Sequence, residues 1–284
     1  MARRRHASRP VFNCRANRRR SDAGISRRVS STGETIETYP RSRSLQGAAN
    51  HTSPRRGNPP YDESLIQAVG ISVSALLQVP PEPIACLVLA HGAGAGMEHR
   101  FMAAVADGLM ERHIATLRYQ FPYMEAGSKR PDRPAIATAT VRAAVDAAQT
   151  ALPNVPLFAG GKSYGGRMTS QAQAEAPLPG VKGLVFWGFA LHPAGKPSLN
   201  RAAHLAEVNL PMLFLQGTHD ALAEMSLLSP IIVQLGPRAS LETVELADHS
   251  FHVPAKSGRS DADVLCDLLE RAASWIRKVS EQKQ

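Results

Sequence analysis

The sequence has few aromatic residues, few cysteines and no long hydrophobic run. Aromatic residues make up 5% of its 284 residues, and there are three cysteines. Cys14, Cys86 and Cys266 lack metal-ligand spacing, so we expect no metal site. Cys86 and Cys266 fall in apolar strand and helix patterns, which predicts buried, inert thiols and a reducing, cytoplasmic compartment. No run reaches the ~18 apolar residues of a membrane span.

Positive charge is concentrated at one end of the chain. Of the 33 basic and 24 acidic residues, 14 arginines and three acids lie in residues 1–60, which leaves 19 basic and 21 acidic residues in the remainder. The nearly neutral remainder argues against specific nucleic-acid binding. Residues 1–60 lack apolar periodicity and are predicted to be disordered. A solvated extension, a transit segment and a phosphate-binding arm remain open for this stretch.

From residue 61 onward, short apolar runs alternate with helical patterns. After an opening strand region at 69–79, six strands are predicted at 84–90, 114–119, 155–159, 181–189, 211–216 and 241–246, and a closing helix at 261–279. This alternation predicts one α/β domain over residues 61–284, with a mostly parallel sheet and helices on both faces. Only the loops at 120–134 and 190–208 are long, so little or no lid is expected. Ligands of such sheets bind beyond the carboxyl ends of the strands.

The strand predicted at 155–159 is followed by a G-x-S-x-G motif. Gly161, Ser163 and Gly165 fit a nucleophile elbow, a tight strand-to-helix turn that exposes the serine hydroxyl above the sheet. A phosphate-binding loop would need a glycine at position 156, where Pro156 has no N–H to offer. Lys162, inside the motif, is expected to have a structural or surface role.

A small-residue turn, residues 91–96, follows the strand predicted at 84–90. It lacks the third glycine of a dinucleotide-binding fingerprint, because position 97 is Met97. The turn suits an oxyanion hole in which the backbone N–H groups of Ala93 and Tyr164 bind a developing negative charge. A plain glycine-rich loop is the alternative.

An acid and a histidine follow two later strands. Asp220 comes after the strand at 211–216 and His249 after the strand at 241–246. The chain order Ser163, Asp220, His249 is the order of α/β-hydrolase triads. The rival bases are His219 and His252. The rival acid is Asp248, which precedes His249 directly and is more often a turn residue there.

Five segments together resemble a known family: LVLAHGAGAGMEHRFM, FPYMEAGSKRPDR, FAGGKSYGGRM, LQGTHD and DHSFHV. They are similar to the small α/β-hydrolase branch that includes the KANSL3/Tex30-like and bacterial hydrolase-like proteins, over about residues 69–279. The resemblance implies an α/β-hydrolase fold without a large lid, with Ser163, Asp220 and His249 at the matching positions. It implies no particular substrate, and some relatives are better regarded as scaffolds than as enzymes.

These features together predict a serine hydrolase that acts on an ester-like or other acyl bond of a small molecule. Ser163 would attack, His249 would act as general base, and Asp220 would orient the histidine. This chemistry needs neither a metal nor an organic cofactor. The competing hypothesis is a non-catalytic interaction module that keeps the fold, because a fold alone does not determine a function.

Overall fold

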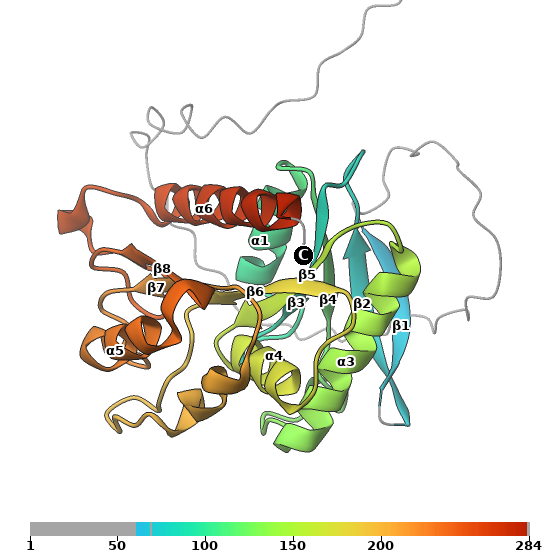
Figure 1. Ribbon diagram of the computed structural model, residues 1–284, viewed down its shortest axis with the longest axis horizontal. Coiled ribbons are helices and arrows are strands. Elements are labelled where there is room, and N and C mark those ends of the chain that lie inside the picture. The colour runs from blue at the N-terminus through green and yellow to red at the C-terminus, as the bar shows by residue number, and fades with distance from the viewer. Residues whose placement is uncertain (1–60, 69, 283–284) are drawn as a thin grey trace, which may run out of the picture. The chain divides into compact units, whose positions relative to one another are not determined.

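A computed structural model describes residues 61–68 and 70–282, with only the backbone of Ile71 (Figure 1). The predicted disorder of residues 1–60 lies outside the described residues. The described part contains a sheet of eight strands in the order β1-β2-β4-β3-β5-β6-β7-β8. The strands are β1 (Asp62–Ala68), β2 (Ile71–Gln78), β3 (Ala85–Ala90), β4 (Ile114–Tyr119), β5 (Leu157–Lys162), β6 (Val181–Trp187), β7 (Met212–Gly217) and β8 (Ala239–Val244). β1 and β2 run antiparallel to their neighbours, and all other pairs are parallel.

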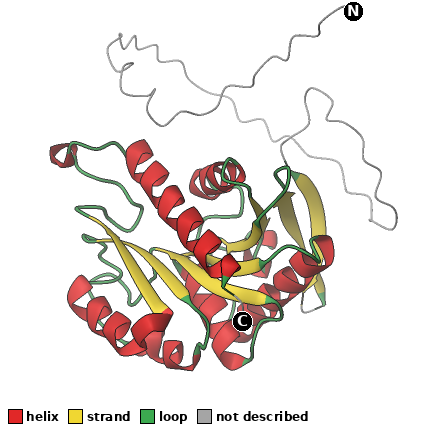
Figure 2. Ribbon diagram, turned by 45° about the horizontal axis from the view of Figure 1, so that its top comes forward, coloured by secondary structure: helices red, strands yellow, loops and turns green. Residues whose placement is uncertain are grey.

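Helices cover both faces of the sheet (Figures 1 and 2). One face carries α1 (Arg100–Met110) and α6 (Asp261–Glu281), and the other carries α3 (Pro134–Ala151), α4 (Tyr164–Glu175) and α5 (Met225–Leu235). The short elements are α2 (Pro122–Glu125) and the 3-10 helices η2 (Asn200–Glu207), η3 (Gly236–Arg238) and η4 (Ala255–Ser257). None of the described helices combines the length and the apolar character that crossing a bilayer requires.

The central strands are apolar throughout because both of their faces are buried. In β3, Cys86 and Val88 pack in the cluster beneath α3 and α4, whereas Leu87 and Leu89 pack in the cluster beneath α1 and α6. This alternation explains why the sequence of β3 reads as a continuous apolar run. Burial also raises the pKa of the Cys86 thiol to about 12, so this cysteine is inert at neutral pH, as predicted.

The prediction of a buried Cys266 is wrong, because this residue is only half-buried. Its position on α6 places it beside Arg112, whose guanidinium lies 3.9 Å from the Cys266 sulfur. The fully buried stripe of α6 runs through neighbouring positions such as Leu268 and Ala272 instead. Helical periodicity alone was too coarse to separate the centre of the stripe from its margin.

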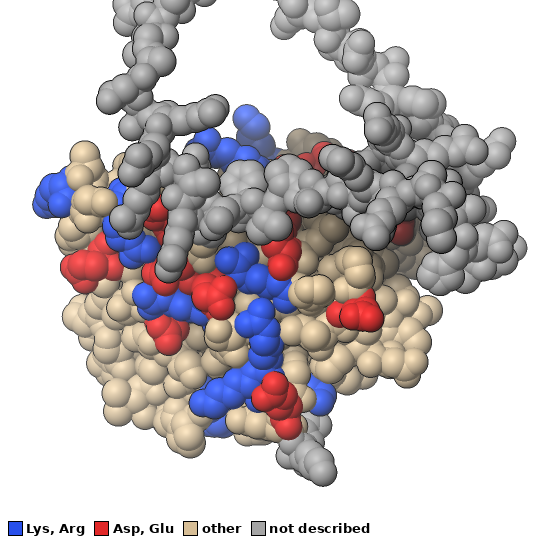
Figure 3. Space-filling view, turned by 90° about the horizontal axis from the view of Figure 1, so that it is seen from above, with Lys and Arg blue, Asp and Glu red and all other residues tan. Residues whose placement is uncertain are grey.

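The outer side of α6 is covered by paired charges. Arg271 contacts Asp267 at 3.0 Å and Glu242 at 2.7 Å, and Arg259 contacts Asp267 at 3.1 Å. Figure 3, which views the molecule from the α6 side of Figure 1, shows positive and negative side chains interspersed on this face. The charges on this face therefore compensate one another locally.

The opening strand region predicted at 69–79 contains β2, but the edge of the sheet has a further strand, β1, that was not predicted. That stretch contains a turn, and the chain folds into the hairpin of β1 and β2, in which Ala68 pairs with Ile71. Gly70 has a φ of +77°, a conformation that glycine adopts without strain. β1 escaped prediction because its sequence, DESLIQA, is largely polar and exposed, as an edge strand tolerates.

The strand order reverses direction at β3, and this reversal positions the site. The chain passes from β3 to β4 on one side, and then returns to place β5 on the other side of β3. Ligands of open α/β sheets bind at such a switch point, beyond the carboxyl ends of the two strands. No separate lid domain covers this edge within the described residues. The segment 188–211, between β6 and β7, contains only the 3-10 helix η2.

Candidate active site

Ser163 lies at the turn between β5 and α4, at the switch point. Its backbone has φ +53° and ψ −112°, a sparsely populated conformation for a residue with a side chain. The surrounding backbone enforces this turn. A Cβ atom added to Gly161 would lie 2.3 Å from the Ala90 carbonyl oxygen, and one added to Gly165 would lie 2.5 Å from the His91 carbonyl oxygen. Both glycines are therefore required by the close approach of the end of β3.

His91 joins the loops that follow β3 and β4. Its Nδ1 lies 2.8 Å from the Gly92 carbonyl oxygen, and its Nε2 lies 3.0 Å from the Phe121 backbone nitrogen. The carbonyl can only accept and the N–H can only donate, so the proton of the neutral ring is on Nδ1. Burial lowers the pKa of His91 to about 4, which keeps the ring neutral near pH 7. The loop that begins at Gly92 is thereby anchored beside Ser163.

The side chains of Ser163, His249 and Asp220 form a continuous chain of hydrogen bonds. His249 Nε2 lies 2.8 Å from Ser163 Oγ, and His249 Nδ1 lies 2.7 Å from Asp220 Oδ2. A carboxylate can only accept, so the ring proton belongs on Nδ1 and leaves Nε2 free to accept from the serine hydroxyl. The arrangement can withdraw a proton from Ser163.

Asp220 is buried, with 3% of its surface exposed, and its oxygens are held by further donors. Gln216 Nε2 donates to Oδ2 at 2.5 Å, and the Leu222 backbone N–H donates to Oδ1 at 2.8 Å. These bonds fix the carboxylate in one orientation and compensate its removal from water. Sequence analysis did not identify Gln216, although its place as a polar residue inside the apolar strand β7 was a usable signal.

The three rivals from the sequence lie apart from Ser163. His219 is exposed, and His252 is exposed and pairs with Asp261 at 2.9 Å. Asp248 accepts hydrogen bonds from the backbone N–H groups of Ser250 and His252, at 2.8 and 2.9 Å. Asp248 is therefore a turn residue, as its sequence position predicted.

Two backbone N–H groups beside Ser163 remain available. No acceptor within residues 61–68 and 70–282 takes up the N–H of Ala93 or that of Tyr164, the first residue of α4. Ala93 follows Gly92, and a Cβ atom added to Gly92 would lie 3.8 Å from the Cβ atom of Ser163. The helix N-terminus adds a partial positive charge at Tyr164. Both donors are thus close to the serine and free to bind a negative oxygen atom.

Lys162 reaches under the loop that carries His249. Its ammonium group donates a hydrogen bond to the His249 carbonyl oxygen, and lies 4.9 Å from the centre of the Phe251 ring and 5.7 Å from that of Phe101. Strand alternation places Lys162 on the same face as Phe158, toward α1 and α6. Of the two predicted roles, structural or surface, the contacts therefore favour the structural one.

Burial destabilises the charged form of the Lys162 side chain. Burial lowers the pKa of its ammonium to about 8, an effect that nearby Asp220 and Asp248 partly oppose. The ring faces and the carbonyl oxygen supply the remaining stabilisation. The neighbours on which this depends, Phe101 and Phe251, come from distant segments, which is why the sequence did not reveal the contact.

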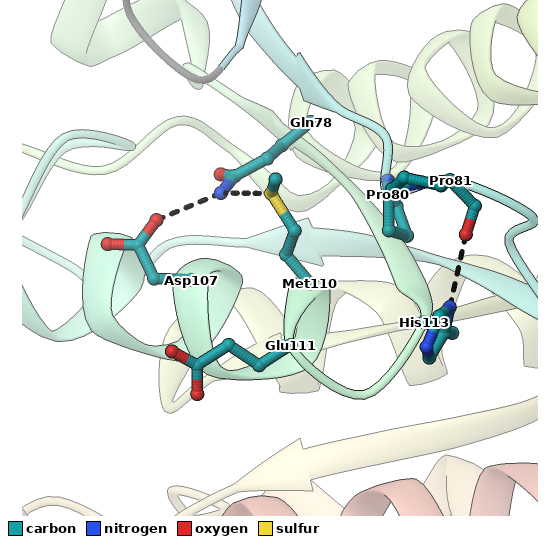
Figure 4. A pocket seen from close by; sticks show the side chains of 7 residues that line it. All are labelled: Gln78, Pro80, Pro81, Asp107, Met110, Glu111 and His113. Atoms are coloured by element: carbon teal, nitrogen blue, oxygen red, sulfur yellow. Dashed lines mark hydrogen bonds between the residues drawn. The ribbon is translucent and has the colours of Figure 1, made fainter. Parts of the chain in front are cut away.

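A pocket of about 280 Å³ opens at the opposite, amino edge of the parallel strands (Figure 4). Gln78 donates to Asp107 Oδ1 at 2.9 Å inside it, and His113 lies 3.1 Å from the Pro81 carbonyl oxygen. The remaining lining residues are Pro80, Met110 and Glu111. The pocket contains no nucleophile paired with a base.

The described residues contain no cluster of three or more histidine, cysteine, aspartate or glutamate side chains placed to bind a metal ion. The expectation that the chemistry needs neither a metal nor a cofactor stays a prediction.

Comparison with known proteins identifies the class. Residues 83–277 match the family model described as "Alpha/beta hydrolase domain", and the chain belongs to this family. The predicted α/β-hydrolase fold, mostly parallel and without a lid, is confirmed.

Three solved structures illustrate the likeness in fold. A dienelactone hydrolase from Anabaena variabilis is 19% identical with a TM-score of 0.63, covering 78% of this chain and 99% of that one. An α/β serine hydrolase without lid from Xanthomonas campestris is 18% identical with a TM-score of 0.61, covering 80% and 100%. Est1E from Butyrivibrio proteoclasticus is 18% identical with a TM-score of 0.59, covering 78% and 99%.

Proposed function

We propose that the protein is a serine hydrolase that cleaves an ester-like or other acyl bond of a small molecule through an acyl-enzyme. The observation that carries the proposal is the hydrogen-bonded chain from Ser163 through His249 to Asp220. Its three members follow β5, β8 and β7, and meet at the switch point of the sheet. The segments quoted above further favour the KANSL3/Tex30-like branch of the family.

In the first step, Ser163 Oγ attacks the acyl carbonyl carbon while His249 Nε2 accepts the hydroxyl proton. Asp220 holds the imidazole in the required tautomer and stabilises the imidazolium that forms. The tetrahedral intermediate collapses when its bond to the alcohol breaks, and His249 returns the proton to the departing alkoxide. In the second step His249 activates a water molecule, which releases the acid and regenerates the serine.

The N–H groups of Ala93 and Tyr164 form the oxyanion hole in this mechanism. Negative charge on the carbonyl oxygen grows only as the tetrahedral intermediate forms, so donors placed beforehand lower the barrier more than they strengthen ground-state binding. The bonds of His91 to Gly92 and Phe121 hold the first of the two donor loops in place.

Turnover of a panel of 4-nitrophenyl esters of increasing acyl length tests the proposal. Ser163→Ala and His249→Ala should each lower kcat by about 10⁴-fold or more, as for other triads. Ser250→Ala and His219→Ala serve as matched controls, because both side chains are exposed and neither contacts Ser163. A wild-type protein that is as inactive as Ser163→Ala toward every ester would favour the non-catalytic alternative.

A further inference from the structure

One face of α4 meets η2 through positively charged and polar side chains. Arg167 lies on α4, and Arg201 and His204 lie on η2. All three side chains are half-buried. The proposed catalytic steps use none of them.

Arg167 has no anionic partner among the residues that the structure describes. Its guanidinium lies 5.6 Å from the centre of the Tyr164 ring, and its Nε is buried without a hydrogen-bond acceptor. Burial is the main cause that lowers the pKa of Arg167, and the positive charge of Arg201 lowers it further. The contact between Ser170 on α4 and His204 on η2 brings the two helices together here, so the charges of Arg167 and Arg201 act on each other where water screens them only in part.

Neither arginine forms an ion pair with any carboxylate of the described residues. The arginines of the α6 face provide the contrast, since Arg271 pairs with both Asp267 and Glu242. A half-buried guanidinium that lacks a carboxylate is costly, and a bound anion would remove this cost.

His204 lies in the same positively charged environment. Its Nε2 lies 2.8 Å from the Ser170 hydroxyl, and burial together with the charge of Arg167 lowers its pKa to about 4. The ring is therefore neutral near pH 7, so it neither adds to the repulsion nor competes with the arginines for an anion. The two guanidinium groups remain as the recognition elements.

Arg167 lies close to Ser163 along the chain, and η2 brings Arg201 to the same side of α4. The Arg167 N–H donates to the Ser163 carbonyl oxygen at 3.1 Å, which places Arg167 one turn of α4, about 5.4 Å along the axis, from the serine. The backbone of Arg167 is therefore one helical turn from that of the nucleophile.

We propose that Arg167 and Arg201 form an anion-binding subsite that selects acyl substrates carrying a carboxylate a few atoms from the scissile bond. The planar guanidinium offers paired donors that match the two oxygens of a carboxylate. The selection of substrates rests on the proposed hydrolase function, whereas the binding of an anion by the two arginines does not require turnover.

Two esters of similar length test the selection. Mono-4-nitrophenyl glutarate ends in a carboxylate, whereas 4-nitrophenyl pentanoate ends in a methyl group. We expect the wild-type protein to favour the glutarate ester about tenfold in kcat/KM, a ratio typical of charge-assisted hydrogen bonds in a partly exposed site. The preference should decline as the ionic strength rises.

Arg167→Gln and Arg201→Gln should each reduce this ratio toward one. Arg277→Gln is the matched control, because it removes the same charge from α6 and should leave the ratio unchanged. An equal loss toward both esters in Arg167→Gln would assign the residue a structural role through Tyr164 and would overturn the subsite. A ratio of one in the wild-type protein would overturn it as well.

Calorimetric binding of monomethyl glutarate to the Ser163→Ala protein separates the two proposals. We expect binding that weakens about tenfold when Arg167→Gln is added. If Ser163→Ala binds monomethyl glutarate while the wild-type protein shows no esterase activity, the result would support the subsite and count against the hydrolase. Active hydrolysis with no difference between monomethyl glutarate and methyl pentanoate in binding would overturn the subsite and leave the hydrolase intact.

Discussion

Buried polar groups lie at both ends of the parallel strands, but within the described residues only those at the carboxyl end link a serine to a histidine and an acid. There, Asp220 accepts from His249, Gln216 and Leu222, and His249 in turn contacts Ser163. At the amino edge, Gln78 donates to Asp107 and Met110 and accepts from Arg118, but this network contains no nucleophile.

Neither a cavity nor backbone strain identifies the candidate site. A cavity of about 280 Å³ lies at the amino edge, away from Ser163. Positive φ angles occur at both edges, with His113 at +60° and Ser163 at +53°. What differs is a nucleophile linked to a base that is itself oriented by an acid, which is the arrangement that acyl transfer needs. The candidate site is therefore identified by connected proton donors and acceptors and not by a cavity.

The largest difference is expected between two neighbouring acids of the carboxyl edge. Asp220→Asn should lower kcat by about 10³- to 10⁴-fold, because the amide no longer favours the proton on His249 Nδ1. Asp248→Asn should lower it less than fivefold, since that carboxylate only caps a turn. Kinetics of both variants, with thermal midpoints as a folding control, check this. The reverse order of effects would show that the acid is Asp248.

A second contrast concerns stability at acid pH. The pKa of His91 is about 4 in the fold, below its ordinary value of 6.5. The unfolded chain therefore binds the proton first, and stability should fall between pH 6.5 and 4, by about 3 kcal/mol from this residue, and level off below pH 4. Urea unfolding of wild type and His91→Asn across this range checks the slope. An identical slope in both proteins would mean that folding leaves the pKa of His91 unchanged.

Lys162→Met should have an intermediate effect. It removes the bond to the His249 carbonyl oxygen and the contacts with two rings, and should lower kcat about tenfold, far less than Ser163→Ala. Lys256→Met, on the exposed helix η4, is the control. A loss as large as that of Ser163→Ala would mean that Lys162 takes a direct part in the reaction.

The smallest effect is expected at the amino edge. Asp107→Asn alters the pocket of Figure 4 but should change kcat by less than twofold, because the residue lies on α1 away from the switch point. Ester turnover and urea unfolding of this variant are sufficient to check it. A marked loss of activity in a stable protein would contradict the distinction between the edges.

Much of the fold followed from local sequence, and the exceptions have physical causes. The apolar runs of β3 and β7 identified strands buried on both faces. The predicted end of β5 was too early, because Gly160 and Gly161 resemble a loop in the sequence. In the structure they belong to the strand, where the neighbouring backbone leaves no room for a side chain. A Cβ atom on Gly160 would lie 1.9 Å from the Val185 carbonyl oxygen.

The candidate site was predicted from residues that follow strands in a set order. Ser163, Asp220 and His249 do come together, although their catalytic roles stay predictions. The contacts of Lys162 and Arg167 could not be predicted, since they depend on side chains from distant segments. The predicted order of strands indicated which loops meet at the carboxyl ends of the strands. It did not indicate how the side chains within these loops are oriented.

Labelling with a fluorophosphonate shows whether Ser163 is an activated nucleophile, because the reagent requires an activated serine and no knowledge of the substrate. We expect one label per chain, located by peptide mass spectrometry on Ser163. Labelling should disappear in Ser163→Ala, slow strongly in His249→Ala and persist in Ser250→Ala. A folded wild-type protein that remains unlabelled, or labelling that is equal in the wild-type and Ser163→Ala proteins, would show that Ser163 is not the nucleophile.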